Sequence, residues 1–277
     1  MRVFPGALFL VGAAALNLVE GFDNRIRLEK YIKDSNWTVV DMERIQEIKR
    51  LGDRIKKWNA DTLDITNGLG LLIFLLAAGA AAITFFLLIS LYGSAHVGLI
   101  FLLDAVILFF PLWFNGTRKV STQDNLQRKI AIIMEMEAEF KLVKKINETF
   151  VPALLLAREQ SGKSVPVDAR FTVNFAGQPE GFYGLQGQIH LNQVQGTVYP
   201  YFYCVIPARK GFGLHKYVEK IPAGRNITVE FQSDGNAEVI VIRRTTTKNT
   251  GYHTKRFDRL AIFNAALTGA RQILQEN

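Results

Sequence analysis

The most constraining feature of this sequence is a long stretch without charge. No Asp, Glu, Lys or Arg occurs from residue 65 to residue 103, whereas the flanking sequence contains all four. Only a segment that does not need to face water has such a composition. Within it, residues 69–92 are long enough, at about 1.5 Å per residue, to cross a hydrocarbon core of about 30 Å. The sequence therefore predicts an integral membrane protein.

A second apolar segment follows after a short turn. Residues 97–115 contain Asp104, and Pro111 lies near their far end, where a kink is tolerated. We predict a two-pass α-helical hairpin over residues 65–115. An acidic side chain inside a spanning helix costs about 2.5–3.5 kcal/mol on insertion scales. Asp104 is therefore the candidate membrane-functional residue: it either lines a pore or a subunit contact, or reaches outward to headgroups and water.

Basic residues next to the hairpin give its predicted orientation. Nine Lys or Arg residues flank the two passes, and none lies in the turn between them. They are Lys49, Arg50, Arg54, Lys56, Lys57, Arg118, Lys119, Arg128 and Lys129. Because positive charge beside spanning helices favours the cytoplasmic side, both flanks and the C-terminal domain are predicted to be cytoplasmic. The predicted localisation is that of a multi-pass membrane protein.

The first 20 residues fit three interpretations. Arg2 is followed by an apolar stretch that includes three consecutive alanines, as in a cleavable signal peptide. A cleaved signal would place the residues up to 64 outside the cell, against the orientation that the flanking charges indicate. We therefore favour an uncleaved membrane helix over residues 1–20, with a helix lying in the membrane interface as the third interpretation.

Amphipathic helices are predicted on both sides of the hairpin. In residues 21–64, apolar residues recur at spacings of three or four with charges between them. Residues 116–160 repeat the pattern at an average spacing close to 3.5, which is typical of a coiled-coil seam. We predict a cytosolic helical stalk with coiled-coil-like extensions, packed on itself or forming a seam for a partner or a second copy. Pro152 is expected to end or kink the second helix.

The period of the hydrophobic residues changes to two in residues 165–277. Predicted strands are residues 171–175, 185–192, 198–206, 227–232 and 237–243. The last two flank a Ser-Asp-Gly-Asn turn, which is a hairpin signal, and Pro200 restricts the third to an edge or a bulge. An amphipathic helix over residues 255–274 closes the chain. The sequence therefore predicts a C-terminal α+β domain with an antiparallel sheet or small open barrel of about five strands, covered by that helix.

The positive charge of the chain lies in its second part. The net charge is +8, and residues 116–277 carry 22 Lys and Arg against 14 Asp and Glu. A basic domain beside a bilayer is attracted to anionic headgroups by about 1 kcal/mol per basic side chain near the surface. The segment 242–256 holds five basic residues and no carboxylate, and is predicted to be an anion or membrane contact, with a solvated loop as the alternative. Its candidate residues are Arg243, Arg244, Lys248, Lys255 and Arg256.

Two further features suggest ligand binding. The loop 208–213 contains Arg209, Lys210 and two glycines, so its amides are a candidate anion nest. Tyr199, Tyr201 and Tyr203 share one face of a predicted strand, where they either pack or offer a stacking surface to a base or sugar.

No catalytic, metal or cofactor pattern emerges. The single cysteine, Cys204, excludes an internal disulfide framework, and the four histidines have no metal-ligand spacing. We therefore predict a membrane-anchored, non-enzymatic protein whose cytosolic β-rich domain binds a protein partner, an anionic lipid headgroup or an anionic ligand. The alternative is a subunit of an oligomeric ion pore or transporter that uses Asp104. The lipid bilayer and a second copy of the chain are the other expected partners, and nucleic acid is not expected.

Overall fold

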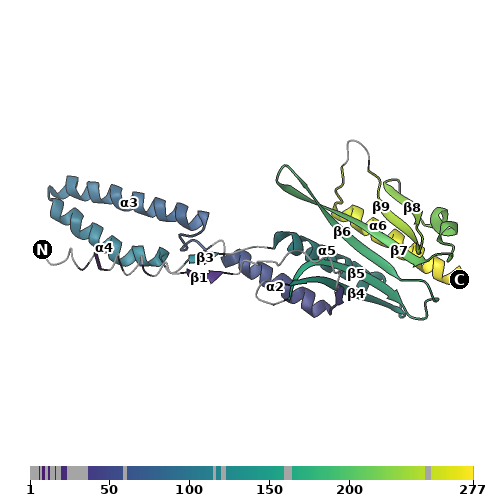
Figure 1. Cartoon of the computed structure of the whole chain (residues 1–277). Coiled ribbons are helices and arrows are strands. Elements are labelled where there is room, and N and C mark those ends of the chain that lie inside the picture. The colour runs from purple at the N-terminus through teal and green to yellow at the C-terminus, as the bar shows by residue number, and fades with distance from the viewer. Residues whose placement is uncertain are drawn as a thin grey trace. The chain divides into compact units, whose positions relative to one another are not determined.

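The computed structural model (Figure 1) describes the larger part of the chain. The described residues are 20–23, 37–58, 61–114, 117–119, 123–158, 164–246 and 251–276, with positions 6, 8, 9, 12 and 16. The chain divides into two compact units, the first comprising residues 1–26 and 51–122 and the second residues 27–50 and 123–277. Lys248 and most of the predicted N-terminal membrane helix lie outside the described residues.

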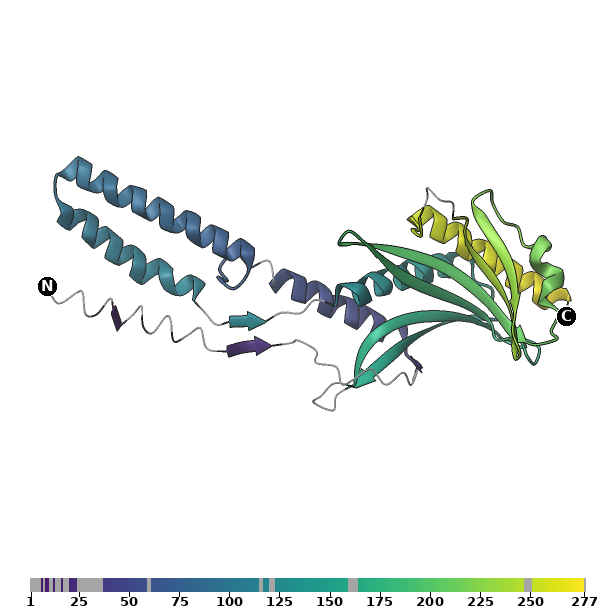
Figure 2. The ribbon, with the colours of Figure 1, turned by 45° about the horizontal axis from the view of Figure 1, so that its top comes forward.

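The first unit contains the predicted helical hairpin. Helix α3 (Gly68–Tyr92) and helix α4 (Ala95–Trp113) run side by side in opposite directions (Figure 2). Gly93 between them has a φ of 62°, a left-handed conformation that glycine adopts readily, and its N–H bonds to the Ile89 carbonyl at 2.9 Å. A Cβ on Gly98 would lie 2.9 Å from the Ile89 side chain, so this glycine permits the close approach of the two helices.

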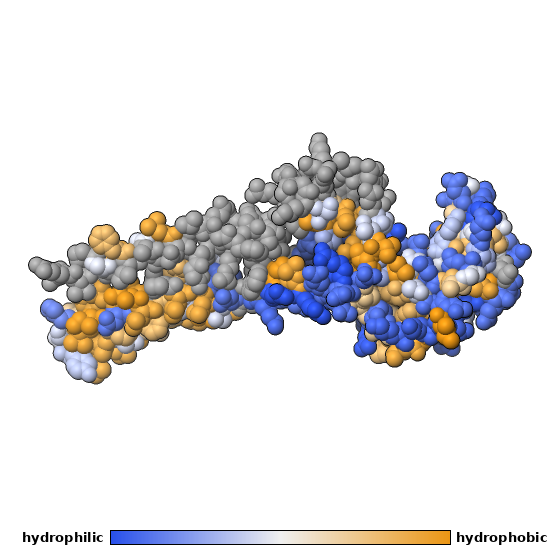
Figure 3. Space-filling view, turned by 90° about the horizontal axis from the view of Figure 1, so that it is seen from below, coloured by the Kyte–Doolittle hydropathy of each residue, from blue (hydrophilic) through white to orange (hydrophobic). Residues whose placement is uncertain are grey.

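The two helices differ in their capacity to span a membrane. By length and composition, α3 is the one helix in the described part of the chain that is long and apolar enough to cross, and its most apolar stretch is not buried against the rest of the chain. In α4 the apolar stretch Ala95–Phe109 is shorter than α3, and the side chains at 110 and 111 lie outside the described residues. Figure 3 shows hydrophobic side chains over much of the visible surface of this hairpin. The predicted helices are therefore present, and only the first meets the length criterion for a span.

Polar contacts close the base of the hairpin. The Asn67 side chain caps α3 by accepting a hydrogen bond from the Gly70 N–H at 2.8 Å, and Trp113 Nε1 donates to the Thr62 carbonyl at 3.1 Å. A Cβ on Gly70 would lie 2.0 Å from the carbonyl oxygen of Asp64, so this site requires glycine. The same unit contains a parallel pair of short strands, β1 (Glu20–Asp23) and β3 (Thr117–Lys119).

The second unit is an α+β domain with an antiparallel sheet of seven strands in the order β2-β4-β5-β6-β7-β9-β8. The strands are β2 (Trp37–Val39), β4 (Glu148–Arg158), β5 (Ser164–Phe175), β6 (Leu185–Val194), β7 (Thr197–Arg209), β8 (Ile227–Ser233) and β9 (Ala237–Arg244). The helices are α2 (Met42–Trp58), which begins in this unit, α5 (Asp124–Val143), the 3-10 helix η1 (Leu214–Lys220) and α6 (Arg256–Glu276). The predicted α+β class and open antiparallel sheet are confirmed, with two strands more than expected.

Helices α5 and α6 lie on one face of the curved sheet (Figures 1 and 2). Because side chains alternate along a strand, every second residue of β5, β6 and β7 points toward these helices. Phe171 at the centre is fully buried, stacks on Phe150 at 4.5 Å between ring centroids, and meets Phe263 of α6 edge-on at 5.9 Å. The core therefore lies between the helices and the sheet, and the opposite sheet face is left for polar and aromatic side chains.

Residues 116–160 do not form a continuous helical stalk. Helix α5 ends at Val143, and residues 148–158 form β4, which pairs with β5. The apolar side of α5, including Ile133 and Met136, is buried in the domain core and not in a coiled-coil seam. Over one short helix, a period of 3.5 cannot be told from the 3.6 of a helix face packed on a sheet. The domain consequently begins well before residue 165.

The two prolines assigned from sequence lie in strands. Pro152 was expected to end a helix but lies within β4, where its carbonyl accepts a hydrogen bond from Val40 N at 3.0 Å. Pro200 lies in β7, an inner strand of the sheet. However, β9 pairs only with residues 203–209 of β7, so at Pro200 the neighbouring strand is β6 alone. The predicted edge character of Pro200 therefore holds locally.

Candidate functional site

The three tyrosines of β7 lie on the sheet face that points away from the helices. Phe202 and Cys204 alternate with them and are fully buried in the core. Tyr201 and Tyr203 lie next to each other, with ring centroids 5.9 Å apart. The predicted shared face of Tyr199, Tyr201 and Tyr203 is therefore confirmed.

The basic segment that follows β9 returns to these tyrosines. Tyr252 meets Tyr201 edge-on, with ring centroids 5.3 Å apart, and His253 meets Tyr199 in the same manner at 5.2 Å. The Asn192 side chain of β6 donates to the Tyr252 carbonyl at 2.8 Å and so holds this segment over the strand. We name the surface formed by Tyr199, Tyr201, Tyr203, Tyr252 and Arg243 the tyrosine–arginine face.

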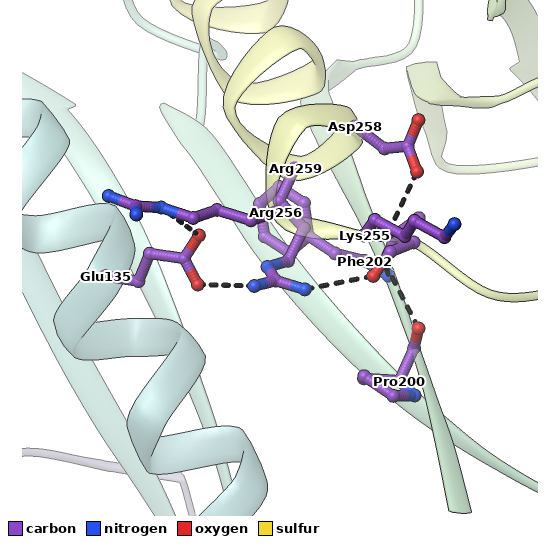
Figure 4. A network of polar contacts seen from close by, with 8 residues as sticks. Glu135, Pro200, Phe202, Lys255, Arg256, Asp258 and Arg259 are labelled. Carbon is purple, nitrogen blue, oxygen red and sulfur yellow. Dashed lines mark hydrogen bonds and ion pairs between the residues drawn. The ribbon is translucent and has the colours of Figure 1, made fainter.

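A polar network anchors the segment from behind (Figure 4). Thr254 N donates to the Pro200 carbonyl at 2.9 Å, and Thr254 Oγ1 accepts from Phe202 N at 2.9 Å. These bonds replace the strand partner that β7 lacks beyond the reach of β9. Arg259 of α6 donates to the Thr254 carbonyl at 2.9 Å and to Glu135 of α5 at 2.5 Å. The position of Tyr252 and His253 is therefore determined by two helices and a strand.

Arg243 of β9 lies opposite Tyr203 in the ladder. Its Nε and Nη2 donate to the two carboxylate oxygens of Glu230 at 3.2 and 2.6 Å, and its Nη1 donates to Thr246 Oγ1 at 3.2 Å. The hydrogen bonds with Glu230, and after them the nearby Tyr201, outweigh burial and raise the pKa of Arg243. A guanidinium has five N–H donors, so these three bonds leave two N–H groups, and the Tyr201 hydroxyl lies near them.

The Tyr201 hydroxyl is buried and is not satisfied by a well-formed hydrogen bond. The residue is 7% exposed, and its hydroxyl lies near the Arg243 guanidinium but does not meet hydrogen-bond geometry with any group in the described part of the chain. Burial, with a smaller effect of Tyr201, raises the pKa of the neighbouring Tyr203, which favours the neutral phenol at that position. Buried polar groups are normally paired, which makes the Tyr201 hydroxyl an exception that needs an explanation.

Cations outnumber anions around the rim of the face. Arg244 donates to the His253 carbonyl at 2.6 Å and lies 3.6 Å from the Asp258 carboxylate. Burial lowers the pKa of His253, and the positive charges of Arg244 and Lys255 lower it further against the opposing effect of Asp258. His253 is therefore favoured in its neutral form, and the local field attracts anions.

The other candidate basic residues are placed as follows. Arg256 lies 3.6 Å from Glu135 (Figure 4), and Lys255 is exposed at the start of α6, where its backbone N–H bonds to Asp258 at 2.8 Å. Arg209 lies 3.8 Å from Glu180, and Lys210 is exposed beside it. The structure brings Arg243, Arg244 and Lys255 to the tyrosine–arginine face. Arg209 and Lys210 lie at the opposite end of the β7–β9 ladder.

The predicted anion nest in loop 208–213 exists, but an anion of the chain itself fills it. The Glu238 carboxylate accepts from the N–H groups of Gly211, Gly213 and Leu214 at 2.9, 2.9 and 3.0 Å. Burial disfavours ionisation of Glu238, but these three bonds and His215 outweigh it and lower its pKa. The nest therefore serves to hold the loop on β9, and an external anion is not expected there.

Asp104 lies on the exposed surface of α4. It makes no hydrogen bond or ion pair with the rest of the described chain. Tyr252 lies in the predicted segment 242–256, whereas Glu230 could not be assigned to the site from sequence because it reaches Arg243 from the neighbouring strand β8. Among the described residues, no three His, Cys, Asp or Glu side chains gather as a metal site.

Comparisons of the chain with protein-family models, curated proteins and solved structures found no match.

Proposed function

We propose that this chain is a membrane-anchored binding protein. In this proposal α3 and α4 cross a bilayer as a hairpin, and the cytosolic α+β domain binds an anionic ligand or lipid headgroup on its tyrosine–arginine face. The exposed and uncharged surface of α3 supports the anchor, since such a surface is stable only in an apolar environment. The tight turn at Gly93 supports a hairpin that enters and leaves on the same side.

One observation carries the binding part of the proposal. A buried hydroxyl without a partner, on Tyr201, lies beside an arginine that has two N–H groups left, on a surface whose rim is positive. Leaving a buried polar group unpaired costs about 1–3 kcal/mol. An anion that accepts from both side chains would satisfy these donors, and charge-assisted bonds are about twice as strong as neutral ones.

The binding proposal predicts a salt-sensitive association that depends on Arg243. The full chain in nanodiscs of neutral lipid should co-sediment with vesicles containing phosphatidylserine but not with pure phosphatidylcholine vesicles, and added salt should weaken the association by screening. Arg243→Gln should reduce the association about tenfold or more, since one charge-assisted bond contributes about 1.5–3 kcal/mol. Arg209→Gln, at the far end of the ladder, is the matched control. Equal binding to both vesicle types, insensitive to salt, would contradict the proposal.

The membrane topology can be tested with introduced cysteines, because the native cysteine should be unreactive. Cys204 is fully buried, and burial raises the pKa of its thiol, so it should not react in the folded protein on either side of the membrane. The native thiol therefore cannot report topology, and exposed cysteines must be introduced. Gly235→Cys in the β8–β9 turn and Ala95→Cys at the start of α4, next to the hairpin turn, provide exposed thiols. In intact cells an impermeant reagent should label position 95 and not 235, and permeabilisation should expose 235. Labelling of position 235 in intact cells would contradict a cytosolic α+β domain.

An oligomeric pore or transporter subunit is the second candidate function. The observation that favours it is Asp104, an exposed carboxylate on an otherwise apolar helix without a partner in the described chain. A charge at this position would face a second copy or a water-filled path. A two-helix hairpin cannot enclose a conduit alone, so this function requires an oligomer, whereas the binding function does not.

A further inference from the structure

We infer that the tyrosine–arginine face contains a phosphate-binding subsite formed by Arg243, Tyr201 and Thr246, with Glu230 as a built-in competitor for the arginine. The inference rests on the proposed function and names the chemistry of its anionic ligand. The phosphate comes either from a lipid headgroup or from a free phosphate compound.

The donors of the subsite converge from different elements. Arg243 on β9 and Tyr201 on β7 belong to paired strands, and Thr246 follows β9 directly, with its Oγ1 3.2 Å from Arg243 Nη1. Tyr203 adds a second phenol, 5.9 Å from Tyr201 between ring centroids. The pairing of β7, β8 and β9 and the ring contacts of Tyr201 hold these side chains, so the donors require little ordering when a ligand binds.

The number and direction of the donors favour phosphate over a carboxylate. Glu230 already occupies one edge of the Arg243 guanidinium with both carboxylate oxygens. The remaining N–H groups share the guanidinium plane, whereas the Tyr201 and Thr246 hydroxyls come from separate side chains and are not confined to that plane. A tetrahedral phosphate offers three oxygens that point in different directions, whereas a planar carboxylate offers two in one plane.

Glu230 opposes the ligand while it holds the arginine. It lies on the edge strand β8, its side chain is 38% exposed, and its negative charge would lie beside the bound phosphate. The ligand must therefore compete with a carboxylate that can swing into solvent. Removing that carboxylate should strengthen phosphate binding, whereas a purely structural ion pair would give no such gain.

Access to Tyr201 depends on Tyr252. Tyr252 packs edge-on against the Tyr201 ring and is 59% exposed, so its side chain can rotate without disturbing the core. The Tyr201 hydroxyl is thus reached by the movement of one surface side chain. The aromatic rings around the subsite would cover the organic part of a phosphorylated ligand.

The inference makes three measurable statements about the full chain in neutral nanodiscs. Calorimetric titration with inorganic phosphate should show binding that acetate does not reproduce. Tyr201→Phe should weaken that binding about tenfold without lowering the stability of the domain, because it removes an unpaired buried hydroxyl. Glu230→Gln should strengthen it severalfold. Tyr183→Phe, which alters an exposed phenol on another loop, is the matched control and should change nothing.

The source of the phosphate is distinguished with vesicles. Phosphatidic acid presents a phosphate monoester at a membrane surface, and phosphatidylserine presents a diester, so preference for the former with weak binding of free phosphate assigns a headgroup. Strong binding of free phosphate, which then displaces the vesicles, assigns a soluble ligand. Unchanged binding by Tyr201→Phe, or equal binding of acetate, would overturn the subsite. If the subsite is overturned but the chain still binds anionic vesicles in a salt-sensitive manner, the proposed function is retained. If the parent chain binds no anion at all, both the subsite and the proposed function are refuted.

Discussion

Replacing Gly187 with alanine should destabilise the α+β domain by about 3 kcal/mol or more, because the site has no room for a methyl group. A Cβ at this position in β6 would lie 2.1 Å from Cζ of Phe171, which is opposite Gly187 in the ladder. The Phe171 ring cannot move aside, since Phe150 stacks on it and Phe202 and Phe263 pack around it. Gly187→Ala therefore tests whether the aromatic core determines the register of β5 and β6.

The native cysteine provides the measurement. Cys204 is the direct partner of Gly187 on β7 and is fully buried, so its reaction with a thiol reagent in increasing urea reports the opening of this part of the sheet. Gly224→Ala is the control, because a Cβ there would meet no atom within 4 Å. In Gly187→Ala the thiol should become reactive at much lower urea, and a second change, Phe171→Leu, should recover part of the loss. Equal urea dependence in parent and Gly187→Ala would show that the core can adapt.

Local patterns in the sequence were sufficient to predict part of the domain. The alternation in β6, the Ser-Asp-Gly-Asn turn between β8 and β9, and the apolar face of α6 all depend on neighbours within a few residues, and the predicted elements are present. Strand β4 could not be found in this way. Its apolar residues continue the spacing of α5, and what makes it a strand is its pairing with β5, a partner that lies beyond it in the chain.

The candidate site likewise has features that were predictable from local sequence and features that depend on distant residues. Arg243 and the three tyrosines were predicted because their side chains and alternation are visible in one short segment each. Their meeting depends on the β7–β9 register, which places Tyr203 opposite Arg243, and on the Thr254 contacts that fold Tyr252 back onto Tyr201. The nest at loop 208–213 was also predicted locally, whereas its occupant Glu238 comes from a different strand. Donors were thus recognisable from sequence, and their acceptors were not.

Breaking the ion pair between Arg271 and Glu148 should be the most costly polar change in the domain. Arg271 Nε and Nη2 donate to the two Glu148 oxygens at 2.7 Å each, and Nη2 also donates to the Val143 carbonyl at the end of α5. The Glu148 side chain is 3% exposed. Arg271→Met would leave this carboxylate buried with the Lys145 N–H as its remaining donor, and loss of one partner of a buried pair costs about 3–5 kcal/mol.

The Arg271–Glu148 pair should also affect how the stability of the domain depends on acid pH. Burial raises the pKa of Glu148, but the hydrogen bonds from Arg271 and Lys145 outweigh it, so the folded pKa lies below the ordinary value of 4.5. The unfolded chain then takes up the proton first as the pH falls. The contribution of Glu148 is therefore present above about pH 4.5 and is lost as the pH falls from there through the folded pKa. Glu148→Gln combined with Arg271→Met should flatten this loss.

The variants should follow a clear order when unfolding of the full chain is monitored through Cys204 labelling in urea. Arg271→Met should be the least stable, and the double variant should recover part of the loss because it buries no unpaired charge. Lys220→Met removes the pair with Glu276, whose two side chains are 47% and 38% exposed, and should cost little because exposed ion pairs are screened by solvent. If Arg271→Met cost no more than Lys220→Met, the pair would be equivalent to a surface contact. The contacts among α5, β4 and α6 would then depend on apolar packing alone.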